Sequence, residues 1–167
     1  MLATRGSPLL SDMSAGIAGL LRSRVGETLS SLDLSRCRLS ANFAAPELVS
    51  ALAHSGVTEL LLNDNRLEDV GIIQLSGVFA YGTCKLRRLE LAGNRLKKNG
   101  LEQLIERIAS SDVKLRVLDI GSSQPIDIRG YVQENFAART RLRLQLHGIT
   151  VLRSTDGATV AEGFDPY

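Results

Sequence analysis

The segment Leu86-Arg-Arg-Leu89-Glu-Leu91-Ala-Gly-Asn94-Arg-Leu96 carries leucine at its first, fourth, sixth and eleventh positions and asparagine at its ninth. A similar arrangement recurs in three further segments, which begin at Leu29, Val57 and Leu115. The four starts are separated by 28, 29 and 29 residues. Constant spacing combined with a matched internal pattern indicates a structural repeat, so the sequence predicts one unit that is used four times.

Each copy predicts a short strand followed by a turn. Alternating leucines face one side of the chain, as in a strand with one buried face. The asparagine, Asn65 in the second copy and Asn94 in the third, falls where the chain leaves the strand, and its amide can satisfy backbone groups of a buried turn. Cys37 and Ser123 occupy this position in the first and fourth copies. We therefore expect Cys37 to be a core residue.

Apolar residues at helical spacing follow each predicted strand. Pro46 can begin a helix after the first copy, because proline fits the first helical turn. Helices are expected over residues 71–79 and 100–108, and a weaker one over 128–138. The repeat unit is therefore predicted to be a strand, a turn and a helix.

The pattern L-x-x-L-x-L-x-x-N-x-L, followed from Gly100 by G-L-x-x-L-x-x-x-I, resembles the ribonuclease-inhibitor-like class of leucine-rich repeats. The resemblance covers roughly residues 29–138. It implies an α/β solenoid with a short, curved parallel sheet on the concave side and helices on the convex side. It also implies that binding other proteins is the common role of such a fold.

The repeats divide the chain into four parts. Residues 1–28 are expected to form an N-terminal capping helix, because a stack of repeats exposes core at its ends. Residues 29–141 hold the four repeats, and residues 142–153 a C-terminal capping strand. Residues 154–167 read as a loose tail, with a docking peptide as the alternative.

The capping helix is expected to start at Ser11 or Asp12 and to run to about Arg24. Gly26 would end it. Its buried stripe is expected to comprise four apolar residues: Met13, Ile17, Leu20 and Leu21.

Composition argues against several classes of function. The formal net charge of +2 is too small to indicate nucleic-acid binding by itself. No stretch approaches the roughly 18–20 apolar residues of a membrane-spanning helix, so no membrane partner is expected. No nucleotide-binding, metal-binding or catalytic motif stands out, so we expect neither a cofactor, nor a small-molecule substrate, nor enzymatic activity.

The predicted location is intracellular, because Cys37 and Cys84 do not form a disulfide framework and suit a reducing compartment. The cytoplasm is the first expectation. Arg5, Arg22 and Arg24 lie among several serines, faintly like a mitochondrial presequence, which makes mitochondria the alternative.

Strand residues that alternate with the core leucines should point to the concave side. They form a mostly acidic row with one apolar member and small residues toward the turn. A partner with basic and apolar groups would suit this surface. The candidate partner-binding residues are Asp33, Glu59, Leu61, Asn63, Arg88, Glu90 and Asp119.

A second candidate surface is basic. Arg66 and Arg95 occupy equivalent positions in successive repeats, as do Arg87 and Arg116, so stacking would align them in rows on the flank of the repeats. These rows could bind phosphate or an acidic protein, but they lack interleaved aromatic residues for base stacking. The candidate residues are Arg66, Arg87, Arg95, Lys97, Lys98 and Arg116.

The sequence therefore predicts a non-enzymatic protein-interaction or scaffold module, a small subunit of a larger intracellular assembly. One alternative is a regulator of an enzyme, such as a GTPase-activating or inhibitor-like protein. Another is attachment to RNA or a ribonucleoprotein through the basic rows.

Overall fold

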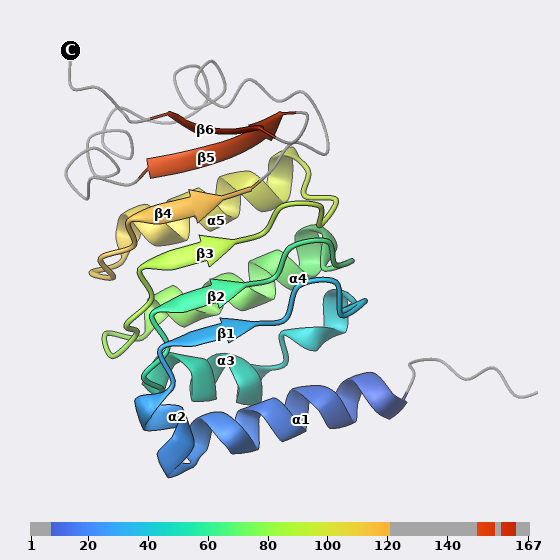
Figure 1. Cartoon of the computed structure of the whole chain (residues 1–167), viewed down its shortest axis with the longest axis vertical. Helices are drawn as coiled ribbons and strands as arrows, with labels where there is room; N and C mark the ends of the chain where they lie inside the picture. The colour runs from blue at the N-terminus through green and yellow to red at the C-terminus, as the bar shows by residue number, and fades with distance from the viewer. Residues whose placement is uncertain (1–7, 121–149, 156–157, 163–167) are drawn as a thin grey trace, which may run out of the picture.

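The computed structural model describes residues 8–120, 150–155 and 158–162, and it shows strand–turn–helix units lying side by side (Figure 1). The strands are β1 (Ser31–Asp33), β2 (Glu59–Leu61), β3 (Arg88–Glu90), β4 (Val117–Asp119), β5 (Thr150–Thr155) and β6 (Ala158–Glu162). The helices are α1 (Pro8–Arg22), α2 (Arg24–Thr28), α3 (Pro46–His54), α4 (Glu68–Leu75) and α5 (Lys98–Ser110). Two 3₁₀ turns, η1 (Ala41–Phe43) and η2 (Ser76–Ala80), complete the described elements.

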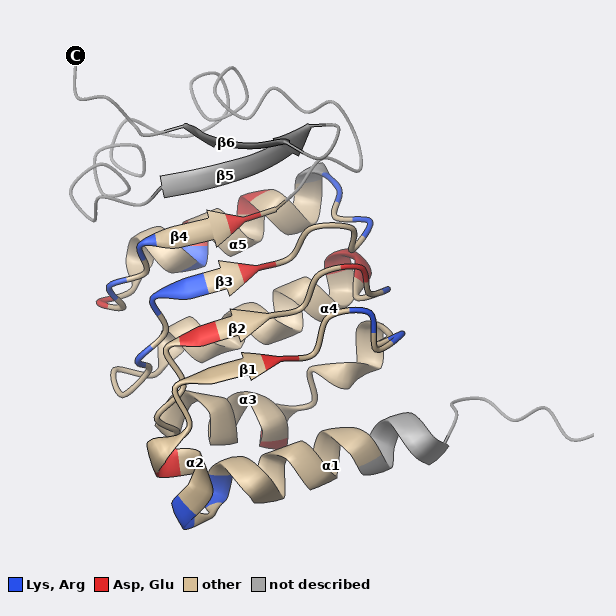
Figure 2. Ribbon diagram, viewed as in Figure 1, with Lys and Arg blue, Asp and Glu red and all other residues tan. Residues whose placement is uncertain are grey.

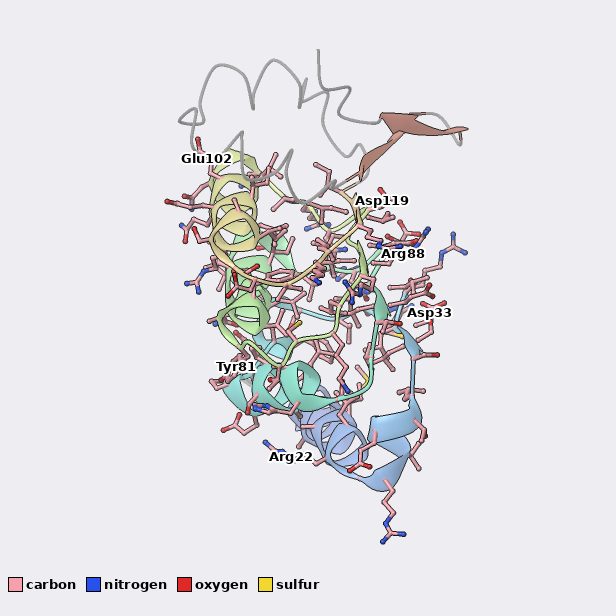
Figure 3. All side chains as sticks on the ribbon, turned by 90° about the vertical axis from the view of Figure 1, so that its left-hand side faces the viewer. Arg22, Asp33, Tyr81, Arg88, Glu102 and Asp119 are labelled. Carbon is pink, nitrogen blue, oxygen red and sulfur yellow. The ribbon has the colours of Figure 1, made fainter. Side chains whose placement is uncertain are left out.

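The strands form one sheet in the order β1-β2-β3-β4-β5-β6. Neighbours from β1 to β5 are parallel, and β6 is antiparallel to β5. The helices α3, α4 and α5 cover one face of the sheet (Figures 1 and 3). The chain is thus an α/β protein with a parallel sheet, as the repeat pattern predicts.

The core follows from the register of the strands. The central leucines Leu60, Leu89 and Leu118 are register partners on successive strands, and each is at most 2% exposed. Their side chains belong to one apolar cluster with the buried faces of the helices, including Leu104 and Ile105 of α5. Because parallel strands need a crossover connection, each helix returns the chain to the start of the next strand.

Helix α5 extends two residues beyond the expected range of 100–108 at each end, and the helix of the second repeat differs more. Helix α3 begins at Pro46, with proline in its first turn, as predicted. The single helix expected over residues 71–79 is instead α4 followed by the 3₁₀ turn η2. Gly71 lies in α4, where a Cβ atom would come within 3.0 Å of the backbone of Ala41, so this helix packs closely on η1.

The asparagines in the turns after β2 and β3 connect one repeat to the previous one. Asn65 Nδ2 donates to the carbonyls of Leu62 in its own repeat and Leu34 in the repeat before, at 2.8 and 2.9 Å. Its Oδ1 accepts from Leu39 N at 3.0 Å. Asn94 Nδ2 likewise donates to Leu91 O and, one repeat back, to Leu62 O. Each asparagine therefore satisfies backbone groups of two turns that would otherwise be buried without partners.

Cys37, at the equivalent position of the first repeat, is exposed, and its prediction as a core residue was wrong. Its Sγ lies 3.5 Å from the carbonyl oxygen of Ser35, two residues away. The physical reason is its place in the stack: Asn65 and Asn94 reach back to a preceding repeat, and the first repeat has none in the described chain.

The turns after β1, β2 and β3 share a backbone conformation that recurs from repeat to repeat. Arg36, Asp64 and Gly93 occupy equivalent positions, and their φ angles are +59°, +55° and +71°. Arginine and aspartate tolerate this left-handed conformation at a cost that glycine avoids. The turn geometry is therefore a property of the repeat rather than of the residue that occupies it.

The N-terminal segment forms two helices rather than one. Helix α1 begins at Pro8 and ends at Arg22, where Ser23 Oγ bonds Leu20 O, and α2 follows. Leu21 is buried and Met13 and Ile17 pack against the core, but Leu20 is 42% exposed, so its predicted burial was wrong. The buried stripe of α1 instead includes the small residues Ser14 and Ala18.

Gly26 lies inside α2 rather than ending the capping helix, contrary to expectation. A Cβ atom at this residue would collide with the backbone of Leu21, and its carbonyl accepts a hydrogen bond from Gly56 N at 2.8 Å. The glycine is therefore needed where α1, α2 and the loop before β2 approach one another.

The C-terminal boundary also differs from the expected one. Strand β5 spans Thr150–Thr155 and pairs with β4, and β6 lies within the segment that was expected to be a loose tail. The signal that was overlooked is Asp156-Gly157, a dipeptide typical of tight hairpins between two runs rich in β-branched residues. Residues 142–149 of the capping strand expected over 142–153, and the weak helix expected over 128–138, lie outside the described residues.

Replacing Gly93 by alanine should destabilise the protein. The substitution places a Cβ atom against Asp64 Oδ1 at a φ of +71°, and the left-handed conformation alone costs about 1–2 kcal/mol. The free energy of unfolding in urea measures the effect. As a matched control, Gly19→Ala in α1 meets open space and should raise this free energy by about 0.5–1 kcal/mol. Equal effects of the two changes would contradict the turn geometry.

Asn65→Ala should lower the free energy of unfolding by about 1–3 kcal/mol, because the backbone groups of Leu34, Leu39 and Leu62 lose a buried partner. Cys37→Ala, at the equivalent position of the first repeat, should change it by no more than about 0.5 kcal/mol. Chemical denaturation of both variants tests the contrast. A large loss at Cys37 would show that the first turn is held by contacts other than those described.

Candidate functional site

The sheet has one face that α3, α4 and α5 do not cover, and we call it the open face (Figures 2 and 3). Its side chains alternate with the core leucines along each strand. Figure 3 shows Asp33, Arg88 and Asp119 on this side, and Tyr81 and Glu102 on the helix side. The open face comprises Ser31, Asp33, Glu59, Leu61, Arg88, Glu90, Val117 and Asp119 of β1 to β4, with Asn63 just beyond β2.

The strand register arranges these residues in two rows. One row runs across the strands from Asp33 through Leu61 and Glu90 to Asp119. The other runs from Ser31 through Glu59 and Arg88 to Val117. Adjacent members of a row are about 4.8 Å apart, which is the separation of neighbouring strands.

The centre of the open face is a closed hydrogen-bond network. Glu90 is 7% exposed, and its Oε2 accepts from Asn63 Nδ2 at 2.6 Å. Its Oε1 forms an ion pair with Arg88, in which Nε lies at 2.6 Å. Asn63 Oδ1 in turn accepts from Ala92 N at 2.9 Å. Both carboxylate oxygens of Glu90 are thus engaged, and its charge is neutralised within the protein.

Asn63 is the residue whose role is least evident in the sequence. The sequence predicts Asn63 as a partner-binding residue of the concave face. In the structure its side chain joins the buried carboxylate on β3 to the backbone of the next turn. Its backbone N–H also donates to Ser35 Oγ of the preceding repeat at 3.2 Å. A polar residue occupies this repeat position in only two of the first three copies, as Ser35 and Asn63, whereas the third copy has Ala92. This pattern gives only a weak signal, because the hydrogen-bond partners come from neighbouring repeats.

Two carboxylates at the β1–β2 end differ from Glu90, because both are exposed. Asp33 Oδ1 accepts from Ser35 N at 2.9 Å, and the backbone and side-chain hydrogen bonds from Ser35 hold the pKa of Asp33 below its usual value. It therefore stays ionised at neutral pH. Among the described residues, the ion pairs of the structure leave Asp33 and Glu59 without a basic partner.

Of the remaining members of the open face, Ser31 is exposed and the other three are half-buried. Leu61 lies between Asp33 and Glu90 in its row, and Val117 follows Arg88 in the other. Asp119 is also half-buried. The face as a whole offers accessible carboxylates at one end and apolar contact beside them.

The predicted basic residues lie at two opposite ends of the strands (Figure 2). Arg66, Arg95 and Lys97 lie in the turns after β2 and β3, where Arg95 pairs with Glu68 at 3.8 Å. Arg87 and Arg116 instead lie just before β3 and β4, and Arg116 N donates to Arg87 O. The side chain of Lys98 lies outside the described part of the structure. The sheet therefore separates the basic residues into two groups.

The helix side has a groove of about 380 Å³ between α3 and η2. Tyr81 lies at its edge, and the ring of His54 meets it edge-on at a centroid distance of 5.4 Å. The lining consists of Ala44, Pro46, Val49, Gln74, Gly77, Ala80 and Tyr81. These residues carry no charge, so the groove offers shape and apolar contact rather than ion pairing.

The described residues give little evidence for metal binding, for membrane insertion or for a reactive cysteine. No group of three or more histidine, cysteine, aspartate or glutamate side chains is placed to hold a metal ion there. None of the described helices has the length and apolar character needed to cross a membrane. Cys84 is half-buried, and this burial raises the pKa of its thiol, which lowers its reactivity.

Glu90→Ala should lower the free energy of unfolding by about 1–3 kcal/mol, because it leaves Asn63 and Arg88 without their shared acceptor. Glu59→Ala, on the adjacent strand and exposed, should change it by no more than about 0.5 kcal/mol. Urea titration of the two variants provides the comparison. If Glu90 proved as dispensable as Glu59, it would have to be counted among the accessible charges of the open face.

Comparison with known proteins agrees with this architecture. Residues 83–104, which include β3 and the start of α5, match the family model described as Leucine Rich repeat. Over 96 residues, or 58% of this chain, the sequence is 34% identical to the human (Homo sapiens) protein named NACHT, LRR and PYD domains-containing protein 14. The aligned region spans 9% of that protein's length. Together with the repeated register of β1 to β4, these similarities support a leucine-rich-repeat architecture for this chain.

Proposed function

We propose that this chain is a non-enzymatic protein-interaction module, a subunit of a larger intracellular assembly, and that it binds its partner with the open face. The observation that carries the proposal is the arrangement of that face. Stacked repeats align polar and apolar side chains in rows across the sheet, and the helices of the repeats lie on its other side. In this proposal the repeats form a short curved solenoid, and the open face is its concave side.

The central network supports this role, because it holds the surface in one conformation. Arg88, Glu90 and Asn63 are fixed by mutual hydrogen bonds before any partner arrives. A preorganised surface loses less conformational entropy on binding than a set of mobile side chains does. The exposed carboxylates of Asp33 and Glu59 lie next to this fixed centre and are available to a partner.

The distribution of basic residues supports an RNA partner less well. Arg66 and Arg95 lie at one end of the strands, and Arg87 and Arg116 at the other, with the acidic open face between them. A nucleic-acid strand needs a positively charged track along its backbone. This separation therefore favours a protein partner for the open face.

Charge reversal at the open face provides the test. The tagged chain is purified from its own cells at moderate salt, and the co-purifying proteins are identified by mass spectrometry. Asp33→Lys combined with Glu59→Lys should remove a stoichiometric set of proteins that the unchanged chain retains. The matched control is Glu102→Lys with Glu106→Lys on α5, which makes the same change in net charge on the helix layer.

The control pair should leave the set of co-purifying proteins unchanged. Thermal unfolding of both double variants ensures that the comparison is made between folded proteins. Equal recovery of the same proteins with both double variants would place the binding surface elsewhere. Recovery of the unchanged chain alone, without partners, would contradict the proposed subunit role.

A further inference from the structure

We propose that the partner segment that binds the open face is a basic amphipathic helix lying across the strands, with about one helical turn over each strand. This inference rests on the proposed function and names the chemistry of the partner. It follows from the charge of the open face, from which of its charges are accessible, and from the spacing of its rows.

The open face is acidic in a chain whose formal net charge is +2. Its charged members are four carboxylates and one guanidinium, which leaves a net charge of three negative. They are Asp33, Glu59, Glu90, Asp119 and Arg88. A surface whose sign is opposite to that of the whole molecule selects and orients a partner of complementary charge. The complementary partner is basic.

The structure shows which of these charges a partner can reach. Glu90 is already neutralised by Arg88 and buried, so a basic side chain placed over it would gain little. Asp33 and Glu59 are exposed on adjacent strands. Accessible negative charge is therefore concentrated at the β1–β2 end, with the half-buried Asp119 at the far end of the same row as Asp33.

The spacing of the row matches a helix. From Asp33 to Asp119 the row crosses four strands, a span of about 14 Å at about 4.8 Å per step. An α-helix rises about 5.4 Å per turn, so side chains at i, i+4, i+7 and i+11 form a stripe that reaches successive strands. A basic residue at i then lies near Asp33 and Glu59, an apolar residue at i+4 over Leu61, and a second basic residue at i+11 near Asp119.

The charge distribution also sets the direction of this helix. The N-terminus of a helix carries a partial positive charge. Because the two exposed carboxylates lie over β1 and β2, the N-terminal end of the partner helix belongs there, and the helix runs toward β4. One helical turn further along the partner helix, Leu61 provides an apolar contact in addition to the charge pairing.

A defined peptide tests this geometry. The probe is a synthetic helical peptide with lysine at positions i and i+11 and leucine at i+4. The control peptide has the same composition, but these three residues are moved to the opposite face of the helix. Fluorescence anisotropy measures the Kd of each for the full chain at ionic strengths of about 0.01 and 0.15 M. We expect the ordered peptide to bind about tenfold more tightly than the control peptide, and less tightly at the higher salt.

Neutral variants of the protein provide the second arm. Asp33→Asn with Glu59→Gln should weaken binding of the ordered peptide by about tenfold, whereas Glu102→Gln with Glu106→Gln on α5 should not. Leu61→Ser should weaken binding without altering its salt dependence. Equal binding of the two peptides, or equal effects of the two double variants, would overturn the proposal.

The outcomes also separate this inference from the proposed function. If the ordered peptide binds no more tightly than the control peptide, but Asp33→Lys with Glu59→Lys still removes the co-purifying proteins, the open face binds a partner of different chemistry. If that double variant removes nothing, the proposed function fails as well.

Discussion

The structure depends on the hydrogen bonds that connect each turn to the turn of the preceding repeat. A turn that is stacked between two others has carbonyl and N–H groups that water cannot reach. Asn65 and Asn94 supply the missing partners from within the stack, and each amide bonds backbone groups of two repeats at once. This constraint fixes the distance and the register between repeats. The leucines then meet in the core, and the residues between them meet on the open face.

The same register makes a surface out of residues that are distant in the sequence. Asp33, Leu61 and Glu90 are separated by 28 and 29 residues along the chain, yet they are neighbours on the sheet. Their environments nevertheless differ. Glu90 is enclosed by Asn63 and Arg88, whereas Asp33 is open to solvent at the edge of the sheet. A row of equivalent positions thus contains both a structural carboxylate and an accessible one.

Much of this architecture could be predicted from the sequence, because period and alternation determine which residues are buried and which strands are neighbours. The parallel order of β1 to β4 and the start of α3 at Pro46 are examples. What could not be predicted depends on position in the stack. Within the described part of the chain, Cys37 fills the asparagine position but has no preceding turn to bond, and Leu20 has an apolar side chain but no neighbour that covers it. The roles of Glu90 and Asn63 depend on contacts between repeats, which no single copy of the pattern reveals.

The hydrogen bonds between repeats have a consequence for how the chain folds. The side-chain bonds that join neighbouring units close loops of 25 to 32 residues, and they do so again in each successive repeat. The loop-closure entropy of each step is therefore nearly the same, since this cost grows only slowly with loop length. Each repeat that has folded then provides the strand and the turn against which the next repeat can form its hydrogen bonds. Folding can then spread along the chain one repeat at a time, without any long-range closure that would require the whole molecule to assemble at once.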